Sequence, residues 1–281
     1  MKQIKLEPTA ALMIQWGKNA FSSDVINKYL EHLDLTAGKT LYDKCNEICS
    51  WYNQVVQNGK IFVNDYLNKK LASSVGEHLI IIPGAGKSPM ALELLNKHWD
   101  KVNKVIEIDI SGMDEKQELY SRLFPAMADK IKCITADITS KSILAVLKTM
   151  VHEYYDDIPC IILLEGVTYF LSKNDIEKII ESFISTGQKN ILLIEYLKPL
   201  NKVHSDLRHI PEKIFSTIKD HSGAKQIFSF PSSYFSKTLL KKGGRLEMKK
   251  NLYDLEKNAY GSNKYFDNAD KGWIEYEIWN I

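Results

Sequence analysis

The chain has 281 residues, of which 44% are hydrophobic and 26% are charged, and its formal net charge is +2. This composition is typical of a globular protein, it excludes a disordered or fibrous chain, and the length suits one large domain or a domain with a cap. The lysines are spread along the whole chain rather than gathered in one stripe, so the sequence predicts no nucleic-acid partner.

The chain begins with Met1-Lys2-Gln3-Ile4-Lys5, and the apolar segment of a signal peptide does not follow. No apolar run elsewhere approaches the ~20 residues of a membrane helix. We therefore expect a cytoplasmic protein with no membrane partner.

Residues 1–72 are predicted to form a helical cap. Apolar residues recur there at spacings of three and four, as in Ile26, Leu30 and Leu33, and no strand pattern interrupts them. About seventy residues are too few for a separate core, so we expect the cap to pack over the rest as a lid or as a brace. Cys45 and Cys49 could provide half a metal site on one helix face, but no further ligands accompany them, so we expect no metal.

Residues 73–281 are predicted to form one α/β domain. Apolar runs that suit buried strands alternate with helix patterns, which is typical of a parallel sheet covered on both faces. We predict strands at 79–82, 105–108, 133–136, 160–164 and 191–194, and helices at 90–97, 114–123, 140–152 and 174–185, the last capped by Asn174-Asp175.

The last third of the chain is predicted to add a helical insertion and two more strands. The insertion is expected at about 198–230, with breaks at Pro199 and Pro211, and a helix at 233–242 follows it. Strands are expected at 245–252 and 273–279, and strict apolar–polar alternation in the second predicts an antiparallel strand with one solvated face. The predicted fold class is a Rossmann-like, doubly wound sheet of parallel strands with a terminal antiparallel strand.

A glycine turn, Pro83-Gly84-Ala85-Gly86-Lys87-Ser88-Pro89, follows the first strand of this domain. Two glycines before a helix allow the backbone to approach a ligand closely. Gly86-Lys87-Ser88 resembles the end of a P-loop, but the first glycine of that motif would fall on Ile81, inside the strand. Pro89 takes the place of the third glycine of a dinucleotide motif. The short turn suits a ligand with an adenosine and a small carboxylate, such as S-adenosylmethionine, and a P-loop NTPase is the disfavoured alternative.

Acidic residues follow the other predicted parallel strands, namely Asp109, Asp137, Glu165 and Glu195. The carboxyl ends of parallel strands meet at one edge of a sheet, where ligands bind, so we expect these side chains to converge. Asp109 is a candidate for the two ribose hydroxyls, although Glu107 points the same way and is an alternative.

The remaining parts of the ligand also have candidate partners. Asp137, with the backbone of Ile138, is placed for adenine, and Glu165 for the ammonium group or the sulfonium charge. Lys60 of the cap is a candidate for the carboxylate. The residues predicted to bind the cofactor are Pro83, Gly84, Ala85, Gly86, Asp109, Ile110, Asp137, Ile138, Glu165, Gly166 and Lys60.

Residues 82–86, 105–109, 135–137 and 163–171 resemble the leucine carboxyl methyltransferase-like branch of the class I S-adenosylmethionine-dependent methyltransferases. The last segment is the most specific, because that branch carries an acidic–glycine pair followed shortly by a tyrosine, here Glu165-Gly166 and Tyr169. The resemblance covers about 79–196. Many members continue the glycine turn with Asp-Thr-Arg, whereas this chain has Lys87-Ser88-Pro89, and the arginine expected in the cap is not evident. These departures favour a small molecule over a protein phosphatase as the substrate.

The resemblance implies S-adenosylmethionine as cofactor, S-adenosylhomocysteine as product, and O-methylation of a small-molecule carboxylate. An ionised carboxylate requires no base at neutral pH, so no catalytic residue is assigned. A phenol or amine acceptor, which is one alternative, would require a base, for which His204, His209 or Tyr196 could serve. The residues predicted to bind the acceptor are Tyr169, Tyr196 and His204. A non-catalytic cofactor-binding module is the other alternative, and the oligomeric state is left open.

Overall fold

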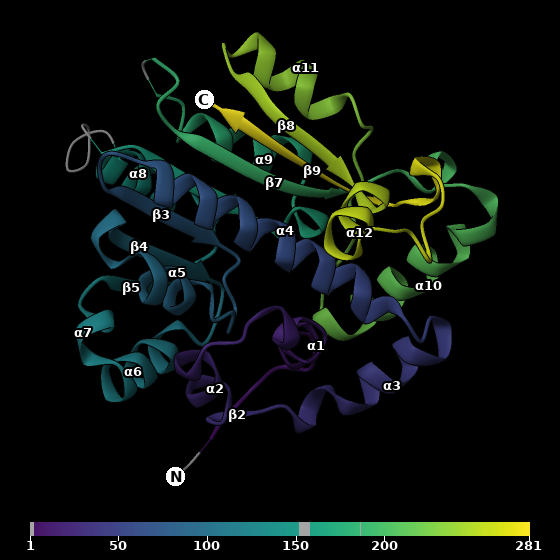
Figure 1. The fold of residues 1–281 in the computed structure, drawn as a ribbon, viewed down its shortest axis with the longest axis horizontal. Coiled ribbons are helices and arrows are strands. Elements are labelled where there is room, and N and C mark those ends of the chain that lie inside the picture. The colour runs from purple at the N-terminus through teal and green to yellow at the C-terminus, as the bar shows by residue number, and fades with distance from the viewer. Residues whose placement is uncertain (1–2, 152–157, 186) are drawn as a thin grey trace.

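The computed structural model describes residues 3–151, 158–185 and 187–281 (Figure 1). Within these residues the main sheet has seven strands in the order β5-β4-β3-β6-β7-β9-β8. Their bounds are β3 His78–Pro83, β4 Val102–Asp109, β5 Ile131–Thr135, β6 Cys160–Leu164, β7 Ile191–Leu197, β8 Arg245–Asn251 and β9 Ile274–Asn280. Strands β3 to β7 pair in parallel, whereas β9 is antiparallel to both of its neighbours. The predicted Rossmann-like sheet with a terminal antiparallel strand is confirmed.

Helices cover both faces of this sheet, because successive residues of its strands are apolar and point to opposite sides. Ile161 and Leu163 of β6 belong to one buried core, and Ile162 and Leu164 belong to the other. The first core is covered by α4 Tyr52–Ser73, α5 Met90–His98, α6 Met113–Leu123, α7 Pro125–Ala128 and α12 Leu252–Tyr260. The second core is covered by α8 Lys141–Thr149, α9 Lys173–Glu181 and α11 Tyr234–Lys241.

The N-terminal helices extend the first core. They are α1 Pro8–Gly17, α2 Asp24–Leu30, α3 Lys39–Ile48 and the long α4, which crosses the sheet in Figure 1. The buried side chains of Leu12 and Trp16 belong to the same core as Ile80 of β3. Helix α10, Ser205–Ser222, packs beside α3 and lies in the predicted insertion. The cap and the sheet therefore share one core, and the division of the chain near residue 72 remains a proposal.

Several local predictions are wrong. The N-terminal segment does contain strands, β1 Ile4–Lys5 and β2 Leu33–Asp34, which pair in parallel; two residues are too few to leave a periodic pattern. Helix α9 is capped by Ser172, whose hydroxyl accepts the N–H of Asp175 at 3.2 Å, rather than by Asn174-Asp175. Helix α10 continues through Pro211, which is buried. The predicted helix 140–152 corresponds to α8, and His152 lies outside the described residues.

The solvated face predicted for the last strand is also wrong. All of β9 is buried, because both of its faces are covered: Tyr276 and Ile278 belong to the first core, and Trp279 belongs to the second. Glu275 and Glu277 point into the protein, where each accepts a hydrogen bond from the Tyr196 hydroxyl, at 2.6 and 2.7 Å. The ammonium of Lys249 lies 3.0 and 2.8 Å from the two carboxylates. Protein donors replace water around these acids, so the alternation of residue types does not indicate exposure here.

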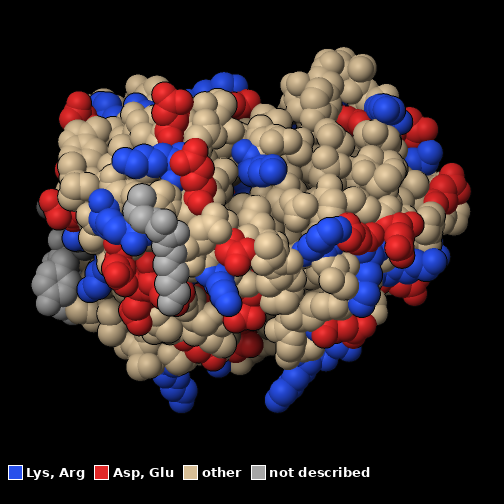
Figure 2. All heavy atoms as spheres, turned by 90° about the horizontal axis from the view of Figure 1, so that it is seen from below, with Lys and Arg blue, Asp and Glu red and all other residues tan. Residues whose placement is uncertain are grey.

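The surface carries both signs of charge. On the face drawn in Figure 2, basic and acidic side chains are interspersed, with no extended area of one sign. None of the described helices is long and apolar enough to cross a membrane.

Candidate active site

The glycine turn after β3 contains two glycines with different surroundings. Gly84 and Gly86 have positive φ angles of 70° and 49°, which favour glycine. A Cβ at Gly84 would lie 2.8 Å from the side chain of Val167, so this glycine allows the loop after β6 to approach. A Cβ at Gly86 would meet only Asp109, at 3.9 Å, so the backbone there borders open space. Ile81 lies inside β3, so a strand residue occupies the position where a P-loop would have its first glycine.

The first two predicted acids stand at the sheet edge. Asp109 ends β4, is partly exposed, and accepts the backbone N–H of Gly86 at 2.7 Å. Asp137 is exposed and accepts the N–H and hydroxyl of Thr139, at 2.8 and 2.7 Å. Ile110 is 72% exposed beside Asp109, whereas Ile138 is buried. At this edge of the sheet, the exposed side chain of Ile110 therefore lies next to the carboxylate of Asp109.

Glu107, the alternative to Asp109, lies deeper. Its side chain is fully buried, and one carboxylate oxygen lies 2.9 Å from the ammonium of Lys116, which is equally buried. The other carboxylate oxygen accepts a weak hydrogen bond from the Cys133 thiol, at a sulfur–oxygen distance of 3.6 Å. Glu107 is thus paired inside the protein, and this arrangement favours Asp109 as the acid that a ligand at the edge would meet.

Lys60 and Glu165 come together although 105 positions separate their numbers in the chain. The Lys60 ammonium, on α4, lies 2.9 Å from a carboxylate oxygen of Glu165, which follows β6. The two side chains are only 15% and 10% exposed. Helix α4 lies close to β9 at this point, and Gly59 makes that possible, because a Cβ there would lie 2.1 Å from the hydroxyl of Tyr276 on β9.

Glu195 lies beside this ion pair. Its carboxylate accepts the hydroxyl of Tyr169 and, at 3.0 Å, the N–H of Gly166. Burial is the main cause that raises the pKa of Glu195 to about 7; the charge of Glu165 adds to it, and the Tyr169 bond and Lys60 oppose it. Sequence reasoning placed Glu195 at the edge but gave it no role, because burial is not visible in a strand-end motif. We call Lys60, Glu165, Tyr169, Glu195 and Tyr276 the rim cluster.

Tyr169, a predicted acceptor residue, belongs to the rim cluster, but Tyr196 and His204 do not. Neighbouring strand residues face opposite sides of the sheet, so Tyr196 points away from Glu195 and into the second core. Its ring packs against that of Phe235, with the ring centroids 4.7 Å apart. His204 is exposed and caps α10, where its Nδ1 accepts the N–H of Asp206 at 3.4 Å. The structure therefore places both residues away from the cluster, and the predictions for them lose their geometric basis.

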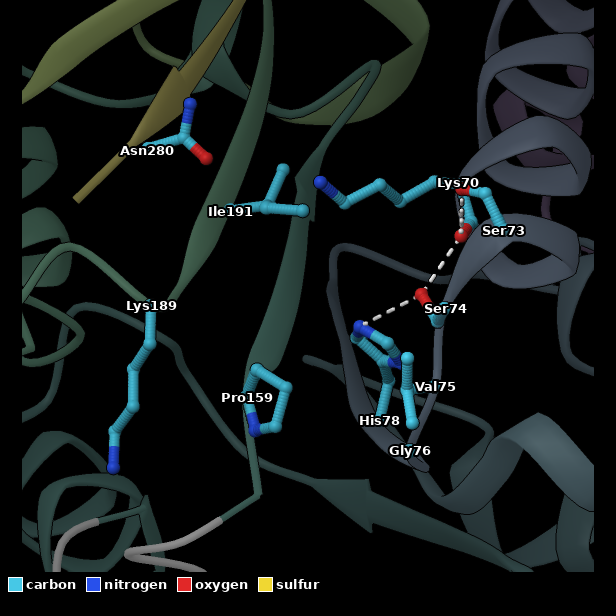
Figure 3. Close-up of a pocket in the computed structure, with 10 residues that line it drawn as sticks. All are labelled: Lys70, Ser73, Ser74, Val75, Gly76, His78, Pro159, Lys189, Ile191 and Asn280. Carbon is cyan, nitrogen blue, oxygen red and sulfur yellow. Dashed lines mark hydrogen bonds between the residues drawn. The ribbon is translucent and has the colours of Figure 1, made fainter.

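A cavity of about 430 Å³ lies at the opposite, amino-terminal edge of the sheet. Figure 3 shows the Lys70 side chain extending across it toward Ile191, and His78 beside Ser74. The Ser74 hydroxyl and His78 Nε2 are 3.4 Å apart. None of the rim-cluster residues lines this cavity, so it is separate from the candidate site.

The cysteines and acids of the described residues form no metal centre. Cys45 and Cys49 are buried free thiols, and burial raises the pKa of each to about 11. No group of three or more His, Cys, Asp or Glu side chains in the described ranges is placed to hold a metal ion.

A sequence profile of the leucine carboxyl methyltransferase family matches residues 33–184, a range that includes Lys60, Asp109 and Glu165. Among solved structures, a candidate methyltransferase from Thermobifida fusca is 12% identical, with a TM-score of 0.63 over 98% of this chain and 95% of that one. A DUF574 family protein from Streptomyces avermitilis is 10% identical, with a TM-score of 0.60 over 97% and 96%. At sequence identities of 12% and 10%, the similarity of these structures is evidence for the fold only. No curated protein sequence matches the chain.

Proposed function

Because the chain belongs to the leucine carboxyl methyltransferase family and is an S-adenosylmethionine-dependent methyltransferase, we propose that it O-methylates a carboxylate of a small molecule. The single observation that carries the proposal is the family match over residues 33–184. It spans the glycine turn, the acids at the ends of β4, β5 and β6, and the lysine that α4 brings to them.

The described residues fit the cofactor. The ion pair of Lys60 and Glu165, 2.9 Å apart, presents a cation and an anion side by side, which complements the carboxylate and ammonium of an amino acid. The rim cluster has two carboxyl groups and one ammonium, so it suits a ligand with a net positive charge. S-adenosylmethionine is such a ligand, and when bound it supplies a methyl group on a sulfonium that a nucleophile can displace.

Each part of the site then has a proposed role. The backbone of residues 83–86 borders the methionine part, and the carboxylate of Asp109 accepts the ribose hydroxyls. Ile110, Asp137 and Ile138 surround the adenine. Lys60, Glu165 and Gly166 hold the amino-acid end, and Tyr169 lines the place of the acceptor. The residues exclude water and orient the acceptor, and orientation of this kind corresponds to effective molarities of about 10⁵–10⁸ M.

A second candidate function is supported by Glu195. A carboxylic acceptor is already ionised at neutral pH and requires no base. The raised pKa of Glu195 and its bond to Tyr169 suit a group that takes a proton from a hydroxyl or amine acceptor as the methyl group is transferred. On this reading Glu195 replaces the histidines and Tyr196 that the sequence suggested as bases.

Two measurements test the proposal. Titration calorimetry is expected to detect S-adenosylhomocysteine binding, and no heat at millimolar ligand would contradict the proposed site. Labelled S-adenosylmethionine is then offered to panels of small carboxylates, phenols and amines. We expect base-labile methyl esters; transfer only to phenols or amines would favour the second candidate, and binding without transfer would indicate a non-catalytic module.

A variant separates the two acceptor classes. Glu195→Gln is expected to leave carboxylate methylation within about threefold of wild type, because no proton is moved. For a hydroxyl acceptor the same change is expected to lower the rate by at least ~10²-fold, the usual contribution of a general base.

A further inference from the structure

Lys87 follows the glycine turn, and only 8% of its side chain is exposed. Its ammonium donates a hydrogen bond to the carbonyl oxygen of Gly112 and lies 3.8 Å from a carboxylate oxygen of Glu115. Burial lowers the pKa of Lys87, and Glu115 partly offsets this effect. Lysines are seldom this buried without partners, so these contacts fix the end of a long, otherwise mobile side chain.

Gly112 closes a short loop that begins at Asp109. It has a positive φ of 69° and immediately precedes α6. A Cβ at this position would lie 2.7 Å from the Lys87 ammonium and would displace it, and the positive φ independently favours a glycine here. At the other end of the loop, Asp109 accepts the N–H of Gly86 at 2.7 Å. The glycine turn therefore holds the 109–112 loop at both ends, by the backbone of Gly86 and the side chain of Lys87.

Lys87 also contacts the N-terminal helices. Its carbonyl oxygen accepts a hydrogen bond from the hydroxyl of Tyr29, on α2, at 3.1 Å. The ring of Tyr29 packs against that of Tyr120 on α6, with centroids 5.5 Å apart. Helix α2, the glycine turn and α6 thus meet at Lys87.

We propose that Lys87 is a positioning residue for the cofactor: its ammonium holds Gly112, so that Asp109 and Ile110 keep the orientation in which the nucleoside binds. This inference rests on the proposed placement of the nucleoside at Asp109. Unlike the lysine of a P-loop, Lys87 uses its ammonium within the protein. Removing the ammonium therefore lowers affinity through the loop, equally for every ligand that carries the nucleoside.

The test is titration calorimetry with S-adenosylhomocysteine and with 5′-methylthioadenosine, which lacks the amino-acid end. Lys87→Met is compared with Lys130→Met. Lys130 is a matched control, because its ammonium also donates to backbone carbonyls, those of Trp99 at 2.9 Å and Val102 at 2.8 Å, away from the site. We expect Lys87→Met to weaken both ligands at least tenfold and by the same factor, and Lys130→Met to change both less than twofold.

Two results would overturn the proposal. Unchanged affinity in Lys87→Met would show that the loop keeps its position alone, and a loss confined to S-adenosylhomocysteine would place Lys87 at the amino-acid end. A wild-type protein that binds neither ligand would instead overturn the proposed cofactor site, and this inference with it. If Lys87→Met does not fold, Gly112→Ala places a methyl group against the same ammonium; we expect the same equal loss, and retained affinity would contradict the proposal.

Discussion

Glu195 is a carboxyl group with 9% of its surface exposed, held between the Tyr169 hydroxyl and the Gly166 N–H. Its neighbour Glu165 already carries the negative charge that pairs with Lys60. Burial is the main reason why the pKa of Glu195 is raised to about 7, and the cost of placing a second negative charge beside Glu165 raises it further. The protonation state of this one residue therefore changes across the pH range in which the enzyme would be assayed.

The first prediction concerns the pH dependence of stability. The folded protein holds the Glu195 proton more tightly than the unfolded chain, whose pKa is near 4.5. The resulting stabilisation is complete below that value and is lost as the pH rises through about 7. We expect Glu195→Gln, which cannot ionise, to gain about 2–3 kcal/mol relative to wild type between about pH 5 and pH 8 in urea unfolding.

The control for this experiment is Glu47→Gln, a change on the exposed face of α3. Its stability difference from wild type is expected to be the same at both pH values. If Glu195→Gln behaves like Glu47→Gln, the pKa of Glu195 is not raised in the protein.

The second prediction concerns the ion pair of Lys60 and Glu165. Lys60→Met leaves the Glu165 carboxylate buried beside Glu195 without its cation, so we expect a loss of about 2–4 kcal/mol of stability. Lys60→Met/Glu165→Gln removes both charges and is expected to regain more than half of that loss. Urea unfolding of wild type, Lys60→Met, Glu165→Gln and the double variant gives the coupling energy as a double-mutant cycle. Losses that simply add would mean that the two side chains do not interact.

At the scale of elements, α4 joins the N-terminal helices to the sheet. Its middle contains Asn58-Gly59-Lys60, and Gly59 packs directly against the Tyr276 hydroxyl of β9. A glycine inside a helix normally costs stability relative to alanine. Here the close approach of α4 to β9 outweighs that cost, and it brings Lys60 to Glu165.

The third prediction tests this packing. Helix propensity alone predicts that Gly59→Ala stabilises α4 by about 1 kcal/mol. Because the new Cβ would lie 2.1 Å from the Tyr276 hydroxyl, we expect a loss of about 2 kcal/mol or more in thermal unfolding instead. Tyr276→Phe removes the oxygen, so Gly59→Ala/Tyr276→Phe is expected to recover part of the loss relative to Gly59→Ala.

The control is Gly17→Ala at the end of α1, where a Cβ would make ordinary contacts of 3.6 to 3.8 Å. We expect Gly17→Ala to leave the melting temperature unchanged or raised. An increase in stability for Gly59→Ala as well would show that α4 is free to move away from β9.

At the scale of the whole molecule, the sequence predicts most of what arises from local pattern. β6 is an apolar run and α9 has isoleucines at helical spacing, so both elements were recognised. The glycine turn and the strand-end acids were recognised for the same reason. The sequence placed Lys60 and Glu165 at opposite groups of one ligand, but it did not predict that they form an ion pair with each other. Strand alternation alone predicts that Glu195 and Tyr196 point to opposite faces of the sheet. The burial of Glu277, and the choice of which of these two residues faces the N-terminal helices, depend on strand order and on which face those helices cover, and local pattern contains neither.

The last prediction is that the proposed cap unfolds together with the sheet. Leu12 of α1 and Ile80 of β3 are fully buried in the same core, and Tyr29, Lys60 and Gly59 add contacts between cap and sheet. Leu12→Ala is expected to cost about 2–5 kcal/mol. If the core is one cooperative unit, native-state hydrogen exchange will show the same loss of protection for amides of β3 as for amides of α4.

Ile179→Ala on α9 provides the comparison, because Ile179 is fully buried in the second core, across the sheet from the cap. It is expected to lower the protection of α4 and β3 by equal amounts, as Leu12→Ala does. A loss confined to residues 8–73 in Leu12→Ala would instead mean that the cap opens by itself. Lys60 would then leave Glu165 whenever it opened, and the N-terminal segment would act as a lid over the site rather than as a fixed wall of it.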